Sequence, residues 1–159
     1  MNKNLVTSLE LSRTLEKLGV KQESEFYWIK NFHTNDPWKI GDKVDIGNNN
    51  DAISKGLEPW YTIGASAFLS GELGEMLPVS LTEKYHELNI TRGGYQNEPD
   101  EVEIKEGKIT NYKEKEMIFD WVIKYIEAYT DKTIHFKRAD TLAESMGEML
   151  KYLKENNLI

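Results

Sequence analysis

The feature that most constrains the fold is a stripe of apolar side chains near the C-terminus. The stripe repeats every three or four residues: Leu142, Met146, Met149, Leu150 and Leu153. That spacing places all of them on one face of a helix, which Asp140 is predicted to cap. Because so wide an apolar face has to be buried against another element, the chain needs at least one further layer.

A second amphipathic helix is predicted near the N-terminus. Its apolar positions are Leu11, Leu15 and Leu18. Thr7 and Glu10 have the spacing of a capping box, in which each side chain satisfies a backbone N–H at the start of the helix. Gly19 suits the left-handed conformation that ends many helices. Two amphipathic helices therefore flank the rest of the chain.

The residues between these helices predict mostly strands. The stretch "FYWIK" at 26–30 is aromatic and β-branched, and residues 38–40 and 44–46 are expected as short strands among turn-forming residues. Residues 85–91 alternate and end at Gly93-Gly94, which predicts a strand followed by a turn. The stretch "MIFDWVIKYIEAYT" favours a strand by composition, with 134–137 as its partner after a turn at 131–133.

Two further segments complete the organisation. A short helix is predicted from Ser70, with Pro78 ending it. The charged segment 97–116 is expected as a mobile hairpin or an insertion. We therefore predict one α+β domain over residues 1–159, in which a small antiparallel sheet is packed by the N-terminal and C-terminal helices.

Composition excludes several classes of chemistry. The chain of 159 residues has no cysteine, so disulfides and thiolate sites are impossible. Its three histidines show no metal-ligand spacing, and no phosphate-binding loop or nucleophile elbow is present, so we expect no cofactor and no metal site. No stretch has the length and apolarity of a membrane span, which predicts a cytoplasmic protein with no membrane partner.

The stretch "LEKLGVKQESEFYWIK" allows a second interpretation. If Gln22–Asn31 were helical, segment 8–31 would form a helix-turn-helix of a small DNA-binding regulator. Its DNA-facing side chains would be Lys21, Gln22, Ser24 and Lys30. Glu23 and Glu25 in the same segment would repel phosphate, and the net charge of −7 disfavours nucleic acid in general. The four bulky residues "FYWI" favour a strand over this alternative.

Aromatic residues suggest a binding surface. Trp38, Trp60 and Tyr61 lie in or beside segments rich in turn-forming residues, where large rings are often exposed and can anchor a partner. For any one of these rings, packing in the core of a small sheet is the commoner role. These three residues are the candidate binding residues, and a protein is the expected partner.

Three blocks of the sequence carry a family resemblance. The blocks are "SLELSRTLEKLGVKQESEFYW", "FLSGELGEMLP" and "ADTLAESMGEMLKYLKENNLI". In order and spacing they resemble small uncharacterised proteins of phages, prophages and mobile elements of bacteria. The resemblance implies a phage-derived or mobile-element accessory protein and implies no reaction. It directs attention to Glu72, Glu75 and Pro78 of the middle block.

These observations leave three functional hypotheses. The first is a non-enzymatic accessory protein that binds a protein partner through aromatic anchors, with its acidic charge steering a basic partner. The alternative is the DNA-binding regulator that uses segment 8–31. The third is an enzyme of unknown type, because the many carboxylates could include a catalytic pair whose pKa values depend on burial. Nothing in the sequence assigns an oligomeric state.

Overall fold

The computed structural model describes residues 3–79, 81, 86–95, 101–105, 108–113, 118–127 and 133–159. Its helices are η1, a short 3-10 helix, and α1 to α4: Lys3–Leu5, Leu9–Lys17, Lys43–Ser54, Ser70–Met76 and Leu142–Glu155. Its strands β1 to β8 are Phe26–Asn31, Lys39–Asp42, Tyr61–Ser66, His86–Tyr95, Glu101–Lys105, Lys108–Lys113, Ile118–Glu127 and Thr133–Ala139. The predicted α+β class, with a helix at either end of the fold, is confirmed.

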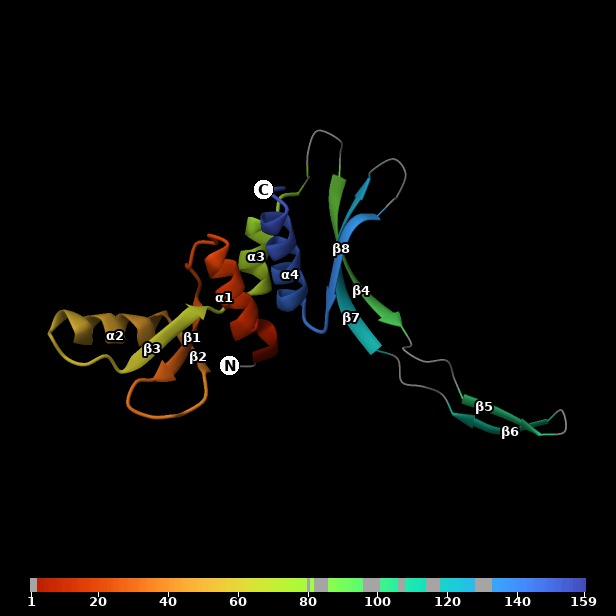
Figure 1. The fold of residues 1–159 in the computed structure, drawn as a ribbon, viewed down its shortest axis with the longest axis horizontal. Helices are drawn as coiled ribbons and strands as arrows, with labels where there is room; N and C mark the ends of the chain where they lie inside the picture. Colours follow the sequence, from red (N-terminus) through yellow and green to blue (C-terminus); the bar gives the residue numbers. More distant parts are fainter. Residues whose placement is uncertain are drawn as a thin grey trace.

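The strands form two separate sheets and a hairpin. One sheet has the order β2-β1-β3 and the other has the order β4-β7-β8, and every neighbouring pair is antiparallel. Helices α1, α3 and α4 lie between the two sheets, while α2 lies beside the first sheet (Figure 1). Segment 97–116 contains β5 and β6, which pair antiparallel and project away from the rest of the molecule (Figure 1).

The main core lies where the three central helices meet the second sheet. The predicted C-terminal stripe is confirmed, since Met146, Met149, Leu150 and Leu153 are all buried in α4. They pack with Leu11 and Leu15 of α1, Leu73 of α3, and Ile123 and Tyr125 of β7. Burying a side chain of this size contributes about 1.5–3 kcal/mol, so this cluster supplies most of the driving force that holds the helices together.

The first and last helices approach each other closely at Gly147. A Cβ atom at this position would lie 2.7 Å from Leu11 Cδ2 and 3.0 Å from Thr7 Cγ2. A side chain larger than hydrogen would therefore force the buried Leu11 and Thr7 side chains to shift.

A smaller core lies on one face of the first sheet. Trp28 of β1 is buried there with Val6 and Ala67, and its indole N–H donates to the carbonyl oxygen of Thr7 at 3.0 Å. This hydrogen bond satisfies the only polar atom of the ring, so the whole indole can be buried without an orphaned donor.

The predicted strand at 26–30 is confirmed as β1, and this rules out the helix-turn-helix alternative. Residues 21–25 form no helix, and Phe26–Asn31 is paired on both sides, with β2 and with β3. Gly19 has φ +78°, and the Val20 N–H donates to the Leu15 carbonyl at 3.0 Å. Gly19 therefore takes the left-handed conformation just after the end of α1, as predicted, and no recognition helix follows.

Segment 43–54 differs from its prediction. Residues 44–46 were expected in a strand, but they belong to helix α2. Asp42 caps this helix: its side chain accepts from the N–H groups of Val44 and Asp45 at 2.9 and 3.0 Å. The Asp45 carboxylate in turn accepts from the Asp42 N–H at 3.3 Å. This capping box starts a helix in a sequence whose glycine and asparagines favour a loop.

Three local predictions need smaller corrections. Helix α1 is capped by Ser8 and not by Thr7, whose hydroxyl is buried and bonded to Ser12 at 2.8 Å. Helix α4 is capped by Thr141 and not by Asp140. Strand β4 continues through Gly93-Gly94, where a turn was predicted, because both glycines pair with β7. The turn predicted at 131–133 lies outside the described residues, apart from its last residue in β8.

Candidate functional site

Only one of the three candidate aromatic residues is well exposed. Trp60 has 60% of its surface accessible. Tyr61, at the start of β3, is half-buried, with the Lys39 ammonium 5.0 Å from the centre of its ring. Trp38 is also half-buried: it packs against the smaller core, and a Cβ on Gly64 would lie 2.6 Å from its ring. Trp60 is therefore the one candidate aromatic whose face a partner could reach.

Three further exposed apolar residues, which the sequence did not single out, lie at the end of β1 and along α2 and the loop that leads to Trp60. The four residues form what we call the distal patch: Phe32, Ile53, Leu57 and Trp60, with exposed fractions of 50%, 51%, 61% and 60%. The Phe32 N–H donates to the Trp60 carbonyl at 2.9 Å, which joins the end of β1 to the start of β3. The loop from α2 to β3 lies at the end of the molecule opposite the β5–β6 hairpin (Figure 1).

Helix α2 holds this loop against the sheet through a buried amide. Asn49, only 2% exposed, accepts from the Tyr61 N–H at 2.9 Å. Ile53 follows one helical turn later on the same side of α2. The tertiary bond from Asn49 therefore brings Ile53 and Leu57 to the same end of the sheet as Trp60.

The four residues of the DNA-binding alternative have structural roles or solvent-facing partners. Gln22 accepts from the Ser66 N–H and donates to the Val20 carbonyl, both at 2.9 Å. The Ser24 hydroxyl is buried, 2.8 Å from the Glu72 carboxylate. Lys21 pairs with Glu23 at 2.7 Å, and Lys30 is half-buried in β1. Two of the four side chains, Gln22 and Ser24, are therefore bonded within the fold.

The middle sequence block centres on Glu72, whose carboxylate joins the start of α3 to the segment that precedes β1. One oxygen accepts from the Glu25 N–H at 2.8 Å, and the other accepts from the Leu69 N–H at 2.7 Å and from Ser24. Glu72 thereby caps α3 and fixes the chain that enters β1. Glu75, in the same block, is exposed. Packing and capping therefore account for this block.

Two shifted pKa values have structural causes. Burial raises the pKa of Tyr125 to about 12, and its hydroxyl donates to the Pro78 carbonyl at 2.7 Å. Lys43 donates a hydrogen bond to Glu25, which raises the pKa of the ammonium. Both effects keep the group in its ordinary protonation state at neutral pH. Within the described ranges, no cluster of three or more histidine, aspartate or glutamate side chains could hold a metal ion.

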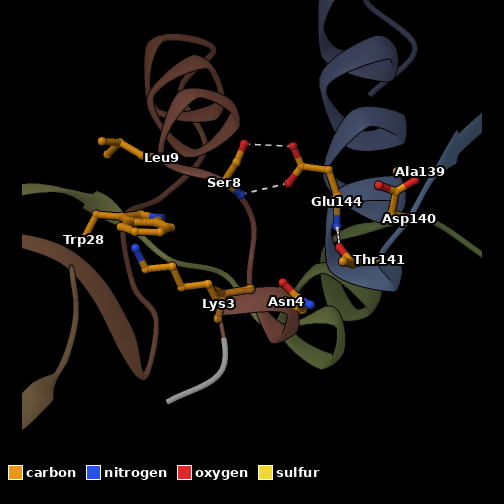
Figure 2. Close-up of a pocket in the computed structure, with 10 residues that line it drawn as sticks. Lys3, Asn4, Ser8, Leu9, Trp28, Ala139, Asp140, Thr141 and Glu144 are labelled. Atoms are coloured by element: carbon orange, nitrogen blue, oxygen red, sulfur yellow. Dashed lines mark hydrogen bonds between the residues drawn. The ribbon is translucent and has the colours of Figure 1, made fainter. Parts of the chain in front are cut away.

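A groove lies where the N-terminal segment meets the start of α4. This groove, which we call the junction groove, has a volume of about 460 Å³ and is lined by residues that include Lys3, Ser8, Trp28, Asp140, Thr141 and Glu144. Figure 2 shows Lys3 extending toward the Trp28 ring, with Asp140 and Glu144 on the opposite wall. The Lys3 ammonium lies 5.7 Å from the centre of that ring.

A double hydrogen bond fixes the wall of the junction groove. Glu144 accepts from the Ser8 N–H and from the Ser8 hydroxyl, both at 2.8 Å (Figure 2). The Glu144 N–H in turn donates to the Thr141 hydroxyl at 3.1 Å. Glu144 therefore satisfies the start of α1 while its own backbone is capped by Thr141. No local sequence pattern reveals this arrangement, because the two partners are 136 residues apart.

Comparisons of the chain with protein-family models, curated proteins and solved structures gave no match. In the part of the chain that the structure describes, no helix has the combined length and apolarity that crossing a bilayer requires.

Proposed function

We propose that this protein is a non-enzymatic accessory protein that binds a protein partner through the distal patch. The observation that carries the proposal is that four apolar side chains, each at least half exposed, come from the end of β1 and from the segment between α2 and β3, which backbone hydrogen bonds hold at one end of the first sheet. Contiguous exposed apolar side chains are typical of surfaces that another protein covers.

Trp60 is the expected anchor of this interface. Tryptophan is enriched among the residues that dominate binding energy, and such residues are surrounded by contacts that exclude water. In this proposal Phe32, whose N–H is bonded to the Trp60 carbonyl, and Leu57, three residues before Trp60, would supply that surrounding ring. Asn49 fixes the loop before a partner arrives, so little ordering entropy would be lost on binding.

The partner is expected to have a basic surface. The chain has a formal net charge of −7, which attracts a positively charged protein from a distance and speeds association. The resemblance of the three sequence blocks to phage and mobile-element proteins supports an accessory role in such an element, with a protein of the bacterial host or of the element as the target.

Affinity capture tests the proposal. The tagged chain is incubated with bacterial lysate, and the retained proteins are compared for wild type, Trp60→Ala and Phe136→Ala. Phe136 is a matched control, because it is 62% exposed but lies on β8 of the second sheet. We expect one stoichiometric partner to be retained by wild type and by Phe136→Ala and to be lost with Trp60→Ala.

Retention of the same partner by Trp60→Ala would refute the role of the distal patch. Circular dichroism of the three proteins provides the folding control, since replacing an exposed side chain should change the free energy of unfolding by less than about 0.5 kcal/mol. Capture should also weaken as salt is added, because the steering charges are exposed and screened.

A further inference from the structure

We propose that the junction groove is a second contact site that takes an arginine side chain of the basic protein partner. This inference rests on the proposed function for the nature of the partner, but it uses a different surface from the distal patch. The groove volume of about 460 Å³ lies within the range of ligand pockets, about 300–1,000 Å³.

The chain itself already places a cation in this groove. The Lys3 ammonium lies 5.7 Å from the centre of the Trp28 ring, within the distance at which a cation is attracted to an aromatic face. Lys3 is exposed and belongs to a short 3-10 helix, so its side chain can leave the ring at little cost. An arginine from a partner would replace it, and a planar guanidinium stacks on an indole better than an ammonium does.

The charge of the opposite wall favours a cation. Asp140 and Glu144 both line the groove, against the single positive charge of Lys3. Asp140 is exposed and can accept two parallel hydrogen bonds from a guanidinium. Glu144 is held in place by Ser8, and each of its oxygens retains a lone pair for a further donor.

An anion is the opposite possibility, since the start of α4 carries the positive end of the helix dipole. Glu144 lies in the first turn of α4 and Asp140 directly precedes its cap, so two full negative charges outweigh that partial positive charge. The groove is therefore a site for a basic side chain.

A peptide titration tests this site without the natural partner. The probe is a capped peptide with two adjacent arginines, and the control peptide has glutamines in their place. Binding is followed by NMR on the indole N–H of Trp28, which donates to Thr7 inside the groove wall. The Trp28 signal is assigned with Trp28→Phe. We expect this signal to move with the arginine peptide and not with the glutamine peptide.

Two pairs of variants separate the groove from general electrostatics. Lys3→Gln should bind the arginine peptide about threefold more tightly than Lys55→Gln, because only the former removes the competing cation, and exchange of one cation–π contact has about this size. Asp140→Asn should bind it about threefold more weakly than Glu58→Gln, a distant exposed carboxylate that changes the net charge equally.

Equal affinities within either pair would overturn the proposal, and so would an unmoved Trp28 signal. Equal affinity for free arginine amide and for the peptide would overturn the docking of a protein partner and indicate a small-cation site. Trp60→Ala should leave the peptide titration unchanged. A failed titration alongside Trp60-dependent capture would therefore refute the groove alone, and the reverse outcome would refute the distal patch alone.

Discussion

The close approach of the first and last helices predicts an unusual response to alanine at Gly147. Glycine to alanine in a helix interior normally stabilises by about 0.8–1 kcal/mol. At Gly147, however, the new Cβ would lie 2.7 Å from Leu11 and 3.0 Å from Thr7. Thr7 is bonded to Ser12 and Phe68 and cannot withdraw without breaking these bonds. The methyl group therefore forces the buried side chains of Leu11 and Thr7 to shift against their neighbours.

Gly47 provides the matched control. It also lies within a helix, α2, but nothing is within 4 Å of the position that its Cβ would take. Gly47→Ala should gain the full helix propensity. Gly147→Ala should gain the same helix propensity, but overpacking should lower its free energy of unfolding by about 1–3 kcal/mol. The difference between the two variants therefore isolates the cost of the contact between α1 and α4.

Urea unfolding followed by far-ultraviolet circular dichroism measures this difference. We expect Gly47→Ala to be more stable than wild type, and Gly147→Ala to be less stable than Gly47→Ala by about 1–3 kcal/mol. In thermal scans each kcal/mol should correspond to about 2–4 °C for a chain of this size. Equal stabilities of the two variants would refute the close packing of these helices.

Three further predictions concern buried polar groups. Glu72→Gln should lower the free energy of unfolding by about 1–3 kcal/mol, because an NH2 group replaces one carboxylate oxygen and faces the N–H of Leu69 or Glu25. Glu75→Gln should leave the free energy of unfolding unchanged in the same urea assay. Asn49→Ala should lower the free energy of unfolding by about 1–3 kcal/mol, because it leaves the Tyr61 N–H unpaired. The backbone amide of Tyr61 should then exchange with deuterium faster. Burial raises the pKa of Tyr125 to about 12, so the folded protein loses stability as the pH rises from 10 toward 12, where the tyrosine of the unfolded chain is already ionised. In Tyr125→Phe the urea midpoint should therefore fall less than in wild type over the same pH interval.

The sequence predicted the elements that have a strong period or composition. The leucine and methionine stripes predicted α1 and α4, since apolar residues at this spacing share one face only when the segment is helical. The aromatic run at 26–30 gave β1, because bulky β-branched and aromatic side chains fit a paired, half-buried strand. In each case the local pattern and the tertiary environment agree, so the pattern alone was sufficient.

Local patterns failed where tertiary contacts decide the structure. Helix α2 contains Gly47 and three consecutive asparagines, which favour a turn. Its capping box and the buried bond from Asn49 to Tyr61 override that preference. Similarly, Gly93-Gly94 has the composition of a turn, but continuous pairing with β7 keeps the strand extended.

Of the two surfaces that we propose as binding sites, the sequence predicted only part of one. Trp60 was a candidate from the start, because it lies in a segment rich in turn formers. Phe32, Ile53 and Leu57 could not be assigned to its surface, since their proximity depends on how α2 packs. The junction groove depends on Ser8 and Glu144, and no local rule relates residues at that separation.

The pairing of Ser8 with Glu144 bears on how the chain folds during synthesis. Helix α1 is synthesised well before α4, so the part of its apolar face that α4 covers stays exposed until α4 follows, although Phe68 and Leu73 of the same core are made earlier. Contacts at such long range close slowly, and exposed apolar helices in the interval are prone to aggregate. Ribosome-bound chains stalled before residue 142 should therefore depend on chaperones more than released chains that include α4.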